Sequence, residues 1–239
     1  MSTAVTGAAY VEAMNRDPTD REYRRAFQNL ALSLAPPNGS VFDFGSGPGI
    51  DAKHYADAGL RVQAYDSDPA MCEYFTRHCA AEIAAGSVRL DTRPYPDFLR
   101  FRSGPRDTSV DLIVANFAPL NLVTDLPPLF AKFSALLKPQ GKLLVSVLNP
   151  FFLGLLKSRQ WWAHLPHLLW KGGYTTRLHG SIPVTRWLPG RLARQAAPHF
   201  ELTSIYAPDT ASAGNPPKPW PRMAATQFLF LQFQCTTRG

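Results

Sequence analysis

Cysteine is scarce in this chain of 239 residues, with three in all, at positions 72, 79 and 235. Three cysteines cannot build a disulfide framework, so we expect a reducing compartment. No window approaches the roughly 20 uninterrupted apolar residues of a membrane-spanning helix. The first residues also lack the basic start and long apolar run of a signal peptide. These absences predict a cytoplasmic globular protein.

Acidic residues are missing altogether from position 126 to position 200. The first 150 residues hold 15 basic and 16 acidic side chains, a net charge of −1, whereas residues 151–239 hold 10 basic and 2 acidic, a net charge of +8. The formal net charge of +7 therefore belongs to the C-terminal part. This asymmetry predicts that the two parts of the chain have different roles.

Strand and helix patterns alternate through the first 150 residues. A first helix is expected from Asp17, which can cap it, to just before Pro36. Strands are then predicted at 40–44, 61–65, 87–90, 110–115 and 142–148, and helices at 50–58, 68–84 and 125–137. A short helix at 191–197 and strands at 201–207 and 226–234 follow an irregular stretch. The fold class is therefore α/β: a Rossmann-like parallel sheet with helices on both faces and a terminal antiparallel hairpin.

The sequence VFDFGSGPG at 41–49 is the most informative local feature. An apolar strand here runs into a glycine cluster that opens a helix, so the backbone can turn tightly and approach a ligand. Asp66 ends the next predicted strand, 21 residues after Gly45, where a carboxylate can accept hydrogen bonds from both ribose hydroxyls. Separately, these could be turn glycines and a helix cap. Together they indicate an adenosine-type cofactor at the carboxyl ends of the strands.

The glycine spacing distinguishes between cofactors. The dinucleotide fingerprint is G-x-G-x-x-G, because a pyrophosphate meets the helix N-terminus. This chain has G-x-G-x-G, with Ile50 at the place of the third glycine of that fingerprint. Asp43, two residues before the first glycine, disfavours a pyrophosphate and suits a cationic amino-acid group. These features indicate S-adenosylmethionine.

The stretch from Asp43 to Gly49, together with Tyr65 and Asp66, resembles the class I S-adenosylmethionine-dependent methyltransferases, and the resemblance covers residues 38–150 best. It implies that the glycine loop and Asp43 hold the methionine part of the cofactor, that Asp66 holds the ribose, and that Met71 packs on the adenine. The cofactor-binding residues that it implies are Asp43, Gly45, Ser46, Gly47, Gly49, Asp66, Ser67, Met71, Asp91, Thr92, Asn116 and Phe117.

The sequence ANFAPLN at 115–121 follows the fourth predicted strand. It resembles the Asn-Phe-x-x-Leu-Asn turn of a subset of small-molecule methyltransferases, which implies that Asn116 and Phe117 border both cofactor and acceptor. Phe117 could equally be a core residue. The DNA and protein amino-methyltransferases often carry Asn/Asp-Pro-Pro-Tyr/Phe at this place. Because the adjacent proline and the terminal aromatic are missing here, a nucleic-acid acceptor is disfavoured.

Residues 151–190 are aromatic and basic, and the resemblance implies a lid over the acceptor. The substrate-binding candidates are Asn121, Trp161, Trp162 and Tyr174. Aromatic walls with a few cations suit an apolar, anionic small molecule. Three other interpretations stay open: a helical insertion that packs on the sheet, a contact with an anionic membrane surface, and a nucleic-acid groove.

The chain is interpreted as one methyltransferase domain, with N-terminal helices at 1–37, a cofactor-binding core at 38–150, a helical lid insertion at 151–190, and a terminal helix and strands at 191–239. A hydroxyl acceptor needs a general base, and the candidates are His54, His164, His167 and His179. No metal site is expected, because no third ligand accompanies His164 and His167 and Pro166 lies between them.

The predicted reaction is methyl transfer from S-adenosylmethionine to an oxygen or nitrogen atom of a small, largely apolar metabolite that can carry an anionic group, with S-adenosylhomocysteine as the product. The donor is already activated, so the protein mainly positions the acceptor and excludes water. The alternatives are an NAD-linked oxidoreductase, an RNA methyltransferase that uses the basic C-terminal part, and a cofactor-binding module without catalysis. The sequence leaves the acceptor and the oligomeric state open.

Overall fold

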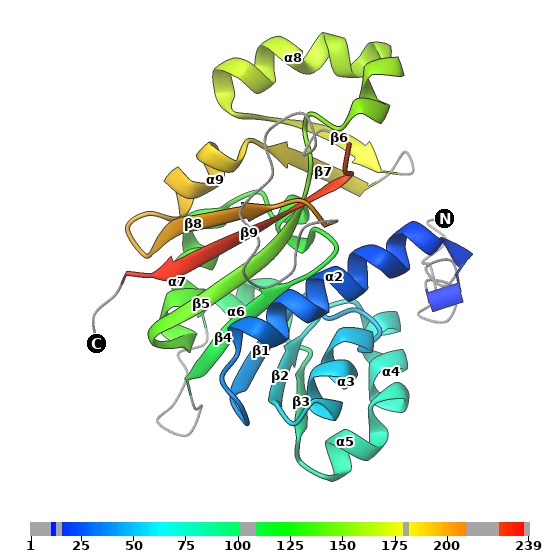
Figure 1. The fold of residues 1–239 in the computed structure, drawn as a ribbon, viewed down its shortest axis with the longest axis vertical. Helices are drawn as coiled ribbons and strands as arrows, with labels where there is room; N and C mark the ends of the chain where they lie inside the picture. The colour runs from blue at the N-terminus through cyan, green and yellow to red at the C-terminus, as the bar shows by residue number, and fades with distance from the viewer. Residues whose placement is uncertain (1–10, 13–15, 101–108, 179–181, 209–224, 237–239) are drawn as a thin grey trace.

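The computed structural model describes residues 11–12, 16–100, 109–178, 182–208 and 225–236. Its main feature is a seven-stranded sheet with the order β3-β2-β1-β4-β5-β9-β8 (Figure 1). Neighbouring strands run parallel except at β9, which is antiparallel to both β5 and β8. The strands are β1 (Ser40–Phe44), β2 (Arg61–Tyr65), β3 (Val88–Asp91), β4 (Val110–Ala115), β5 (Leu137–Leu148), β8 (Phe200–Tyr206) and β9 (Phe228–Cys235). The predicted fold class is confirmed.

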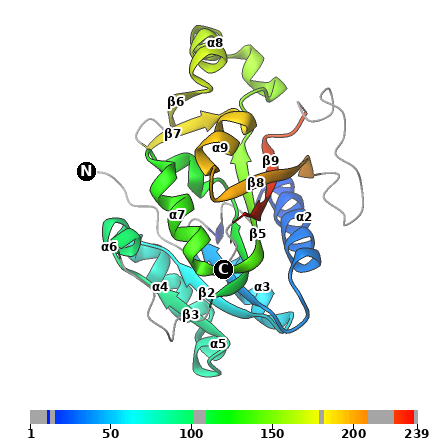
Figure 2. The same cartoon turned by 90° about the vertical axis from the view of Figure 1, so that its left-hand side faces the viewer.

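Helices cover both faces of the sheet (Figures 1 and 2). One face carries α2 (Pro18–Leu34), α3 (Ile50–Asp57), α4 (Pro69–His78) and α5 (Ala80–Ala84), and the other carries α6 (Tyr95–Arg100), α7 (Leu126–Leu136) and α9 (Pro189–Ala196). Each layer encloses its own apolar core. Phe27, Tyr55 and Phe75 are fully buried in the first core, and Phe98 and Phe130 are buried in the second.

Alternation along β1 decides where its polar residue points, because successive side chains of a strand face opposite sides of the sheet. Phe42 and Phe44 pack into the core beneath α6 and α7, whereas Val41 packs beneath α2 and α3. Asp43 therefore points to the face of the sheet that α2 and α3 cover. It is the last residue but one of β1, just before the glycine loop.

Two element boundaries differ from the sequence expectation. The helix predicted at 68–84 is divided at Cys79, which leaves helical geometry and whose thiol Sγ lies 3.5 Å from the carbonyl oxygen of Gly49. The strand predicted at 142–148 starts earlier, at Leu137, because the chain pairs with Val110 as soon as α7 ends. The short helix α6 had no sequence signal of its own.

The segment after β5 forms a separate outer layer. It contains the 3₁₀ helix η2 (Leu153–Lys157), α8 (Arg159–Lys171) and a two-stranded antiparallel sheet of β6 (Gly173–Leu178) and β7 (Ile182–Trp187). In Figure 1, α8 lies at the top of the molecule, far from the sheet. The expected helix is present, whereas the β6-β7 pair was not expected. None of the helices among the described residues has both the length and the apolar character needed to cross a bilayer.

Candidate functional site

The strand order places a topological switch point between β1 and β4, and we call the position at the carboxyl ends of these two strands the crevice. From β1 the chain moves outward to β2 and β3, and it then returns to β4 and β5 on the other side. At such a switch point the loops that follow the two central strands diverge, which leaves room for a ligand at the carboxyl ends of the strands. The two loops are the glycine loop at 45–49 and the turn at 116–122, which ends in the 3₁₀ helix η1 (Pro119–Leu122).

The glycine loop folds back on β2. The amide nitrogens of Gly45 and Ser46 donate to the carbonyl oxygen of Tyr65, at 2.8 and 3.0 Å. A Cβ atom on Gly45 would lie 2.7 Å from Cβ of Pro119, so no side chain fits between the two loops. This glycine therefore closes the loop against η1.

The other two glycines of the loop face different surroundings. Gly49 has φ +85°, and a Cβ there would lie 2.7 Å from the ring of Phe75 and 2.9 Å from Sγ of Cys79. Gly47 has φ +53°, and a Cβ there would meet nothing within 4 Å. Close packing against Phe75 and Cys79 thus explains why position 49 is a glycine, whereas Gly47 borders open space that a ligand can enter.

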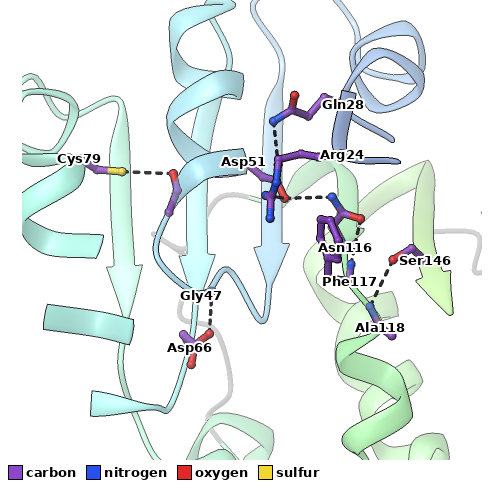
Figure 3. A network of polar contacts seen from close by, with 11 residues as sticks. Arg24, Gln28, Gly47, Asp51, Asp66, Cys79, Asn116, Phe117, Ala118 and Ser146 are labelled. Carbon is purple, nitrogen blue, oxygen red and sulfur yellow. Dashed lines mark hydrogen bonds and ion pairs between the residues drawn. The ribbon is translucent and has the colours of Figure 1, made fainter. Parts of the chain in front are cut away.

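Asp66 at the end of β2 is tied to the glycine loop (Figure 3). Its Oδ2 accepts from the amide of Gly47 at 2.7 Å, and its Oδ1 accepts from the amide of Asp68 at 2.9 Å. Burial raises the pKa of Asp66, although these backbone hydrogen bonds oppose the shift. The next residue, Ser67, is exposed, and Met71 is half-buried in the first turn of α4. The structure thus places Asp66 against Gly47, with Ser67 next to it in the chain and Met71 in the first turn of the following helix.

The end of β3 holds the two other residues expected near the adenine. Asp91 is engaged by Arg93, whose Nε lies 2.9 Å from Oδ1 and whose second guanidinium nitrogen lies 2.5 Å from Oδ2. Burial raises the pKa of Asp91, but the hydrogen bonds from Arg93 outweigh it and bring the pKa below its ordinary value. Thr92 is exposed. The Asp91 carboxylate therefore already has a cationic partner.

Asp43 is a buried carboxylate that lacks a complete set of partners. It is 1% exposed, and its Oδ2 has no hydrogen-bond partner among the described residues. Burial first, and then the charges of Asp51 and Asp66, raise its pKa well above the ordinary value, against an opposing effect from Arg24. The hydroxyl of Ser46 is likewise buried without a described partner. Buried polar groups are normally hydrogen-bonded, so this pair indicates a missing polar or cationic ligand.

A polar cluster around Asp51 joins α2, α3 and β4 (Figure 3). Asp51 lies in the first turn of α3, and its carboxylate forms an ion pair with Arg24 at 2.6 Å. It also accepts from Nε2 of Gln28 at 2.8 Å and from Nδ2 of Asn116 at 3.1 Å. The guanidinium of Arg24 lies 4.5 Å from the ring centroid of Phe117. The N-terminal helix is thus fastened directly to the wall of the crevice.

The turn after β4 has an unusual backbone. Phe117 and Ala118 both have positive φ, at 59° and 64°, a region that costs a non-glycine residue about 1–2 kcal/mol. Side chains hold this turn: Oδ1 of Asn116 accepts from the amide of Phe117 at 2.9 Å, and Oγ of Ser146 accepts from the amide of Ala118 at 3.2 Å. Strain of this kind concentrates at functional sites.

Comparison with known proteins gives the site a chemical context. A family model described as a methyltransferase domain matches residues 14–179, which is more than half of the chain. The chain belongs to the class I S-adenosylmethionine-dependent methyltransferases. A comparison with curated protein sequences found no match.

Three solved structures illustrate the likeness in fold. The CcbJ methyltransferase from Streptomyces caelestis is 17% identical, with a TM-score of 0.65, 95% of this chain and 96% of that one being covered. The 1,6-didemethyltoxoflavin-N1-methyltransferase from Burkholderia thailandensis was solved with 1,6-didemethyltoxoflavin and S-adenosylhomocysteine. It is 19% identical, with a TM-score of 0.62, and the match covers 97% of this chain and 87% of that one. The N-methyltransferase NodS from Bradyrhizobium japonicum WM9 was solved with S-adenosylhomocysteine. It is 14% identical, with a TM-score of 0.59, and the match covers 94% of this chain and 91% of that one.

The cofactor of this methyltransferase family, S-adenosylmethionine, fits the groups found in the crevice. Its amino-acid end carries an ammonium group, which suits the unsatisfied Asp43 oxygen and the Ser46 hydroxyl. The open side of Gly47 gives it room, and Asp66 stands beside that loop at the end of β2. No group of three or more metal-binding side chains occurs among the described residues.

The histidines of the methyltransferase are scattered. His54 lies on α3 beside a groove of about 340 Å³ that Arg21, Arg25, Lys53 and His78 also line. His164 stacks on the ring of Tyr174 with centroids 5.2 Å apart, and His167 is exposed on α8. His179 lies outside the described residues. The described candidate bases lie on two separate elements, His54 on α3 and both His164 and His167 on α8.

Most of the residues proposed to contact the acceptor have partners within the protein. Nδ2 of Asn121 donates to the carbonyl oxygen of Thr185 at 2.5 Å, and its Oδ1 accepts from the amide of Leu148 at 3.1 Å, so Asn121 joins η1 to β5 and β7. Nε1 of Trp161 donates to the carbonyl oxygen of Pro150 at 2.8 Å.

The other two acceptor candidates differ in exposure. Trp162 is more than half exposed, and its Nε1 donates to the carbonyl oxygen of Leu156. Tyr174 is buried beneath His164.

Sequence reasoning missed Arg24, Gln28 and Asp51. The signal in the sequence was the spacing of Arg24 and Gln28, which are four residues apart on one face of the first helix.

Proposed function

We propose that this methyltransferase transfers a methyl group by in-line displacement to an oxygen or nitrogen atom of a small, largely apolar acceptor with an anionic group. The unsatisfied, buried carboxylate of Asp43 beside the open side of Gly47 carries the donor half of this proposal. Bound S-adenosylmethionine supplies an already activated methyl group. The residues of the chain therefore have to bind, orient and exclude water rather than activate the donor.

On the donor side, Asp43 and Ser46 hold the amino-acid end and Asp66 holds the ribose. Met71, which is half-buried at the start of α4, flanks the adenine. Asn116 and Phe117 separate donor from acceptor. Their fixed turn matters because a displacement in line tolerates little misplacement of the acceptor atom.

Arg186 supports an anionic group on the acceptor. It lies on β7 opposite Tyr174 of β6, and one of its guanidinium nitrogens donates to the carbonyl oxygen of Asn149, at the carboxyl end of β5, at 3.1 Å. Burial lowers its pKa, and no described residue forms an ion pair with it. A desolvated cation is costly without a counter-charge, and a carboxylate or phosphate on the acceptor provides one.

Calorimetry with S-adenosylhomocysteine tests the donor half. Binding by the intact protein is expected, and its absence would remove the proposal. Binding of NADH instead favours an oxidoreductase, and steeply salt-dependent RNA binding favours an RNA acceptor. Binding of the cofactor without turnover of any acceptor favours a module that only binds it.

Arg186→Gln tests the acceptor half once a substrate is found in a screen of small aromatic carboxylates and phosphates. The expected result is a KM raised by about tenfold or more, because a charge-assisted hydrogen bond is lost, with an unchanged Kd for S-adenosylhomocysteine. Arg191→Gln, which removes an exposed cation nearby, is the matched control. An unchanged KM in the Arg186 variant rejects the anionic contact.

A further inference from the structure

The outer side of the η2–α8 layer carries most of the large apolar side chains that are exposed among the described residues. Seven large apolar side chains are exposed among the described residues, and six of them lie between positions 153 and 182. Five of these six belong to η2 and α8, and together we call them the outer patch: Leu153, Leu156, Trp162, Leu169 and Trp170. Trp170 is 92% exposed, an extreme value for an indole. Clustering of this kind marks an interaction surface rather than scattered surface residues.

Helical spacing separates the outer patch from the packed side of α8. Trp161 and Leu168, seven residues apart, are buried with Tyr174 in a small core of their own. Trp162 and Leu169, also seven apart, share the adjoining side of the helix, which is exposed. The hydrogen bond from Trp162 to the carbonyl of Leu156 holds η2 beside α8, so the two elements present one surface. Leu169 and Trp170 belong to none of the apolar cores of the described residues, so packing within the layer does not explain why they are apolar.

The charge around the outer patch is of one sign. Lys157, Arg159 and Lys171 are exposed on the same two elements, and none forms an ion pair with a described residue. No acidic residue occurs in the sequence between positions 126 and 200. A surface that combines tryptophan, leucine and unpaired cations complements an apolar layer bounded by negative charge.

The shape of this layer agrees with a flat partner. In both views α8 is the outermost element at one end of the molecule, with its far side turned away from the sheet (Figures 1 and 2). The 13 residues of α8 span about 20 Å, too short to cross the roughly 30 Å of a bilayer core but sufficient to lie in the interface.

We propose that the outer patch docks this protein on an anionic lipid surface, with Trp162, Leu169 and Trp170 entering the interface and Lys157, Arg159 and Lys171 facing the lipid headgroups. Amphipathic helices with tryptophan on one side and cations beside them bind membranes in this way. The inference does not depend on the proposed methyl acceptor, because it concerns the side of α8 that faces away from the core.

Vesicle sedimentation of the full chain tests the proposal. We expect the protein to sediment with vesicles of roughly one part phosphatidylserine to two parts phosphatidylcholine and not with phosphatidylcholine alone, with binding reduced at high salt. The triple variant Lys157→Gln/Arg159→Gln/Lys171→Gln should bind the anionic vesicles on the order of a hundredfold more weakly, at about fivefold per cation. The matched control Arg61→Gln/Arg89→Gln/Arg100→Gln removes the same charge from exposed positions elsewhere and should bind as the parent does.

The contribution of the apolar side chains to vesicle binding is tested separately with Trp170→Ser, which should weaken that binding by roughly tenfold. Leu122→Ser, at an exposed apolar residue outside the outer patch, is its control and should have no effect. Because these side chains are exposed, circular dichroism should show that all variants fold. The proposal is overturned if the parent does not sediment with anionic vesicles, or if both triple variants bind alike. It is also overturned if Trp170→Ser leaves vesicle binding unchanged while it dissociates an oligomer in size-exclusion chromatography.

Discussion

Alanine at Gly49 and at Gly47 should have opposite consequences for folding and for cofactor binding. At Gly49 the new methyl would meet the Phe75 ring at 2.7 Å and the Cys79 sulfur at 2.9 Å, with φ at +85°. The left-handed backbone costs about 1–2 kcal/mol, and overpacking a core adds about 1–3 kcal/mol. Gly49→Ala should therefore lose about 2–5 kcal/mol of stability.

At Gly47 the methyl would meet nothing within 4 Å, with φ at +53°. Gly47→Ala should then lose only the backbone cost of about 1–2 kcal/mol. Its methyl would, however, stand in the open space next to Asp66 where the cofactor is expected, so the affinity for S-adenosylhomocysteine should fall by roughly tenfold or more.

Gly86→Ala is a matched control for the backbone cost alone, because Gly86 also has a positive φ, +74°, and open space around it, but lies in the turn before β3. Urea unfolding without ligand and calorimetry with S-adenosylhomocysteine provide the two measurements. Gly47→Ala and Gly86→Ala should be equally stable, and only Gly47→Ala should bind weakly. If Gly47→Ala binds the ligand as the parent does, the cofactor does not lie against this loop; if Gly49→Ala is as stable as Gly86→Ala, the packing argument is wrong.

Three further substitutions test the charged groups of the crevice. Asp66→Ala should weaken S-adenosylhomocysteine binding about 10- to 100-fold in calorimetry, since a hydrogen bond to a charged group is worth about 1.5–3 kcal/mol; unchanged affinity would remove Asp66 from the site. Arg24→Met should lose about 3–5 kcal/mol in urea unfolding, because Asp51 would stay buried without its cation, and adding Asp51→Asn should restore much of this. Burial raises the pKa of the Asp43 carboxyl above 3.8. The folded chain therefore binds the proton of this carboxyl more tightly than the unfolded chain does, and the protein loses stability as the pH rises from 3.8 through the raised pKa. Asp43→Asn should therefore stabilise the ligand-free protein more near pH 8 than near pH 4, and an equal effect at both would contradict the assigned ionisation.

The sheet was predictable because its signals are local. The strands of the parallel core are apolar runs closed by turns, and α2 and α4 each begin with a capping aspartate followed by a proline, as Asp68 and Pro69 show for α4. The β6-β7 pair was not predictable in the same way. Its strands carry Thr175 and Thr185 facing each other, with Oγ1 atoms 2.9 Å apart, but they lie between tryptophans and prolines that hide the alternation expected of strands.

The position of the glycine loop beside Asp66 was predictable for a related reason. Gly47 and Asp66 lie at fixed offsets from strand ends, and parallel strands that pair in register bring those ends together. Other contacts of the crevice and the outer layer join segments far apart in the chain. Nothing local indicates that Arg24 meets Asp51, or that Arg186 reaches the carbonyl of Asn149, because only tertiary packing creates those pairs.

The crevice holds two energetically unfavourable features that the fold itself does not require. The first core would be more stable with an apolar residue at position 43, since a buried carboxylate with an unsatisfied oxygen is costly. The left-handed turn at Phe117 and Ala118 adds strain. Both lie at the carboxyl ends of β1 and β4. Buried polar atoms without partners also occur elsewhere among the described residues, such as the Tyr95 hydroxyl and Trp187 Nε1 beside the core under α6 and α7, but neither of these two groups is a carboxylate. A buried carboxylate and a strained turn at neighbouring strand ends are the expected result of selection for binding a ligand rather than for stability.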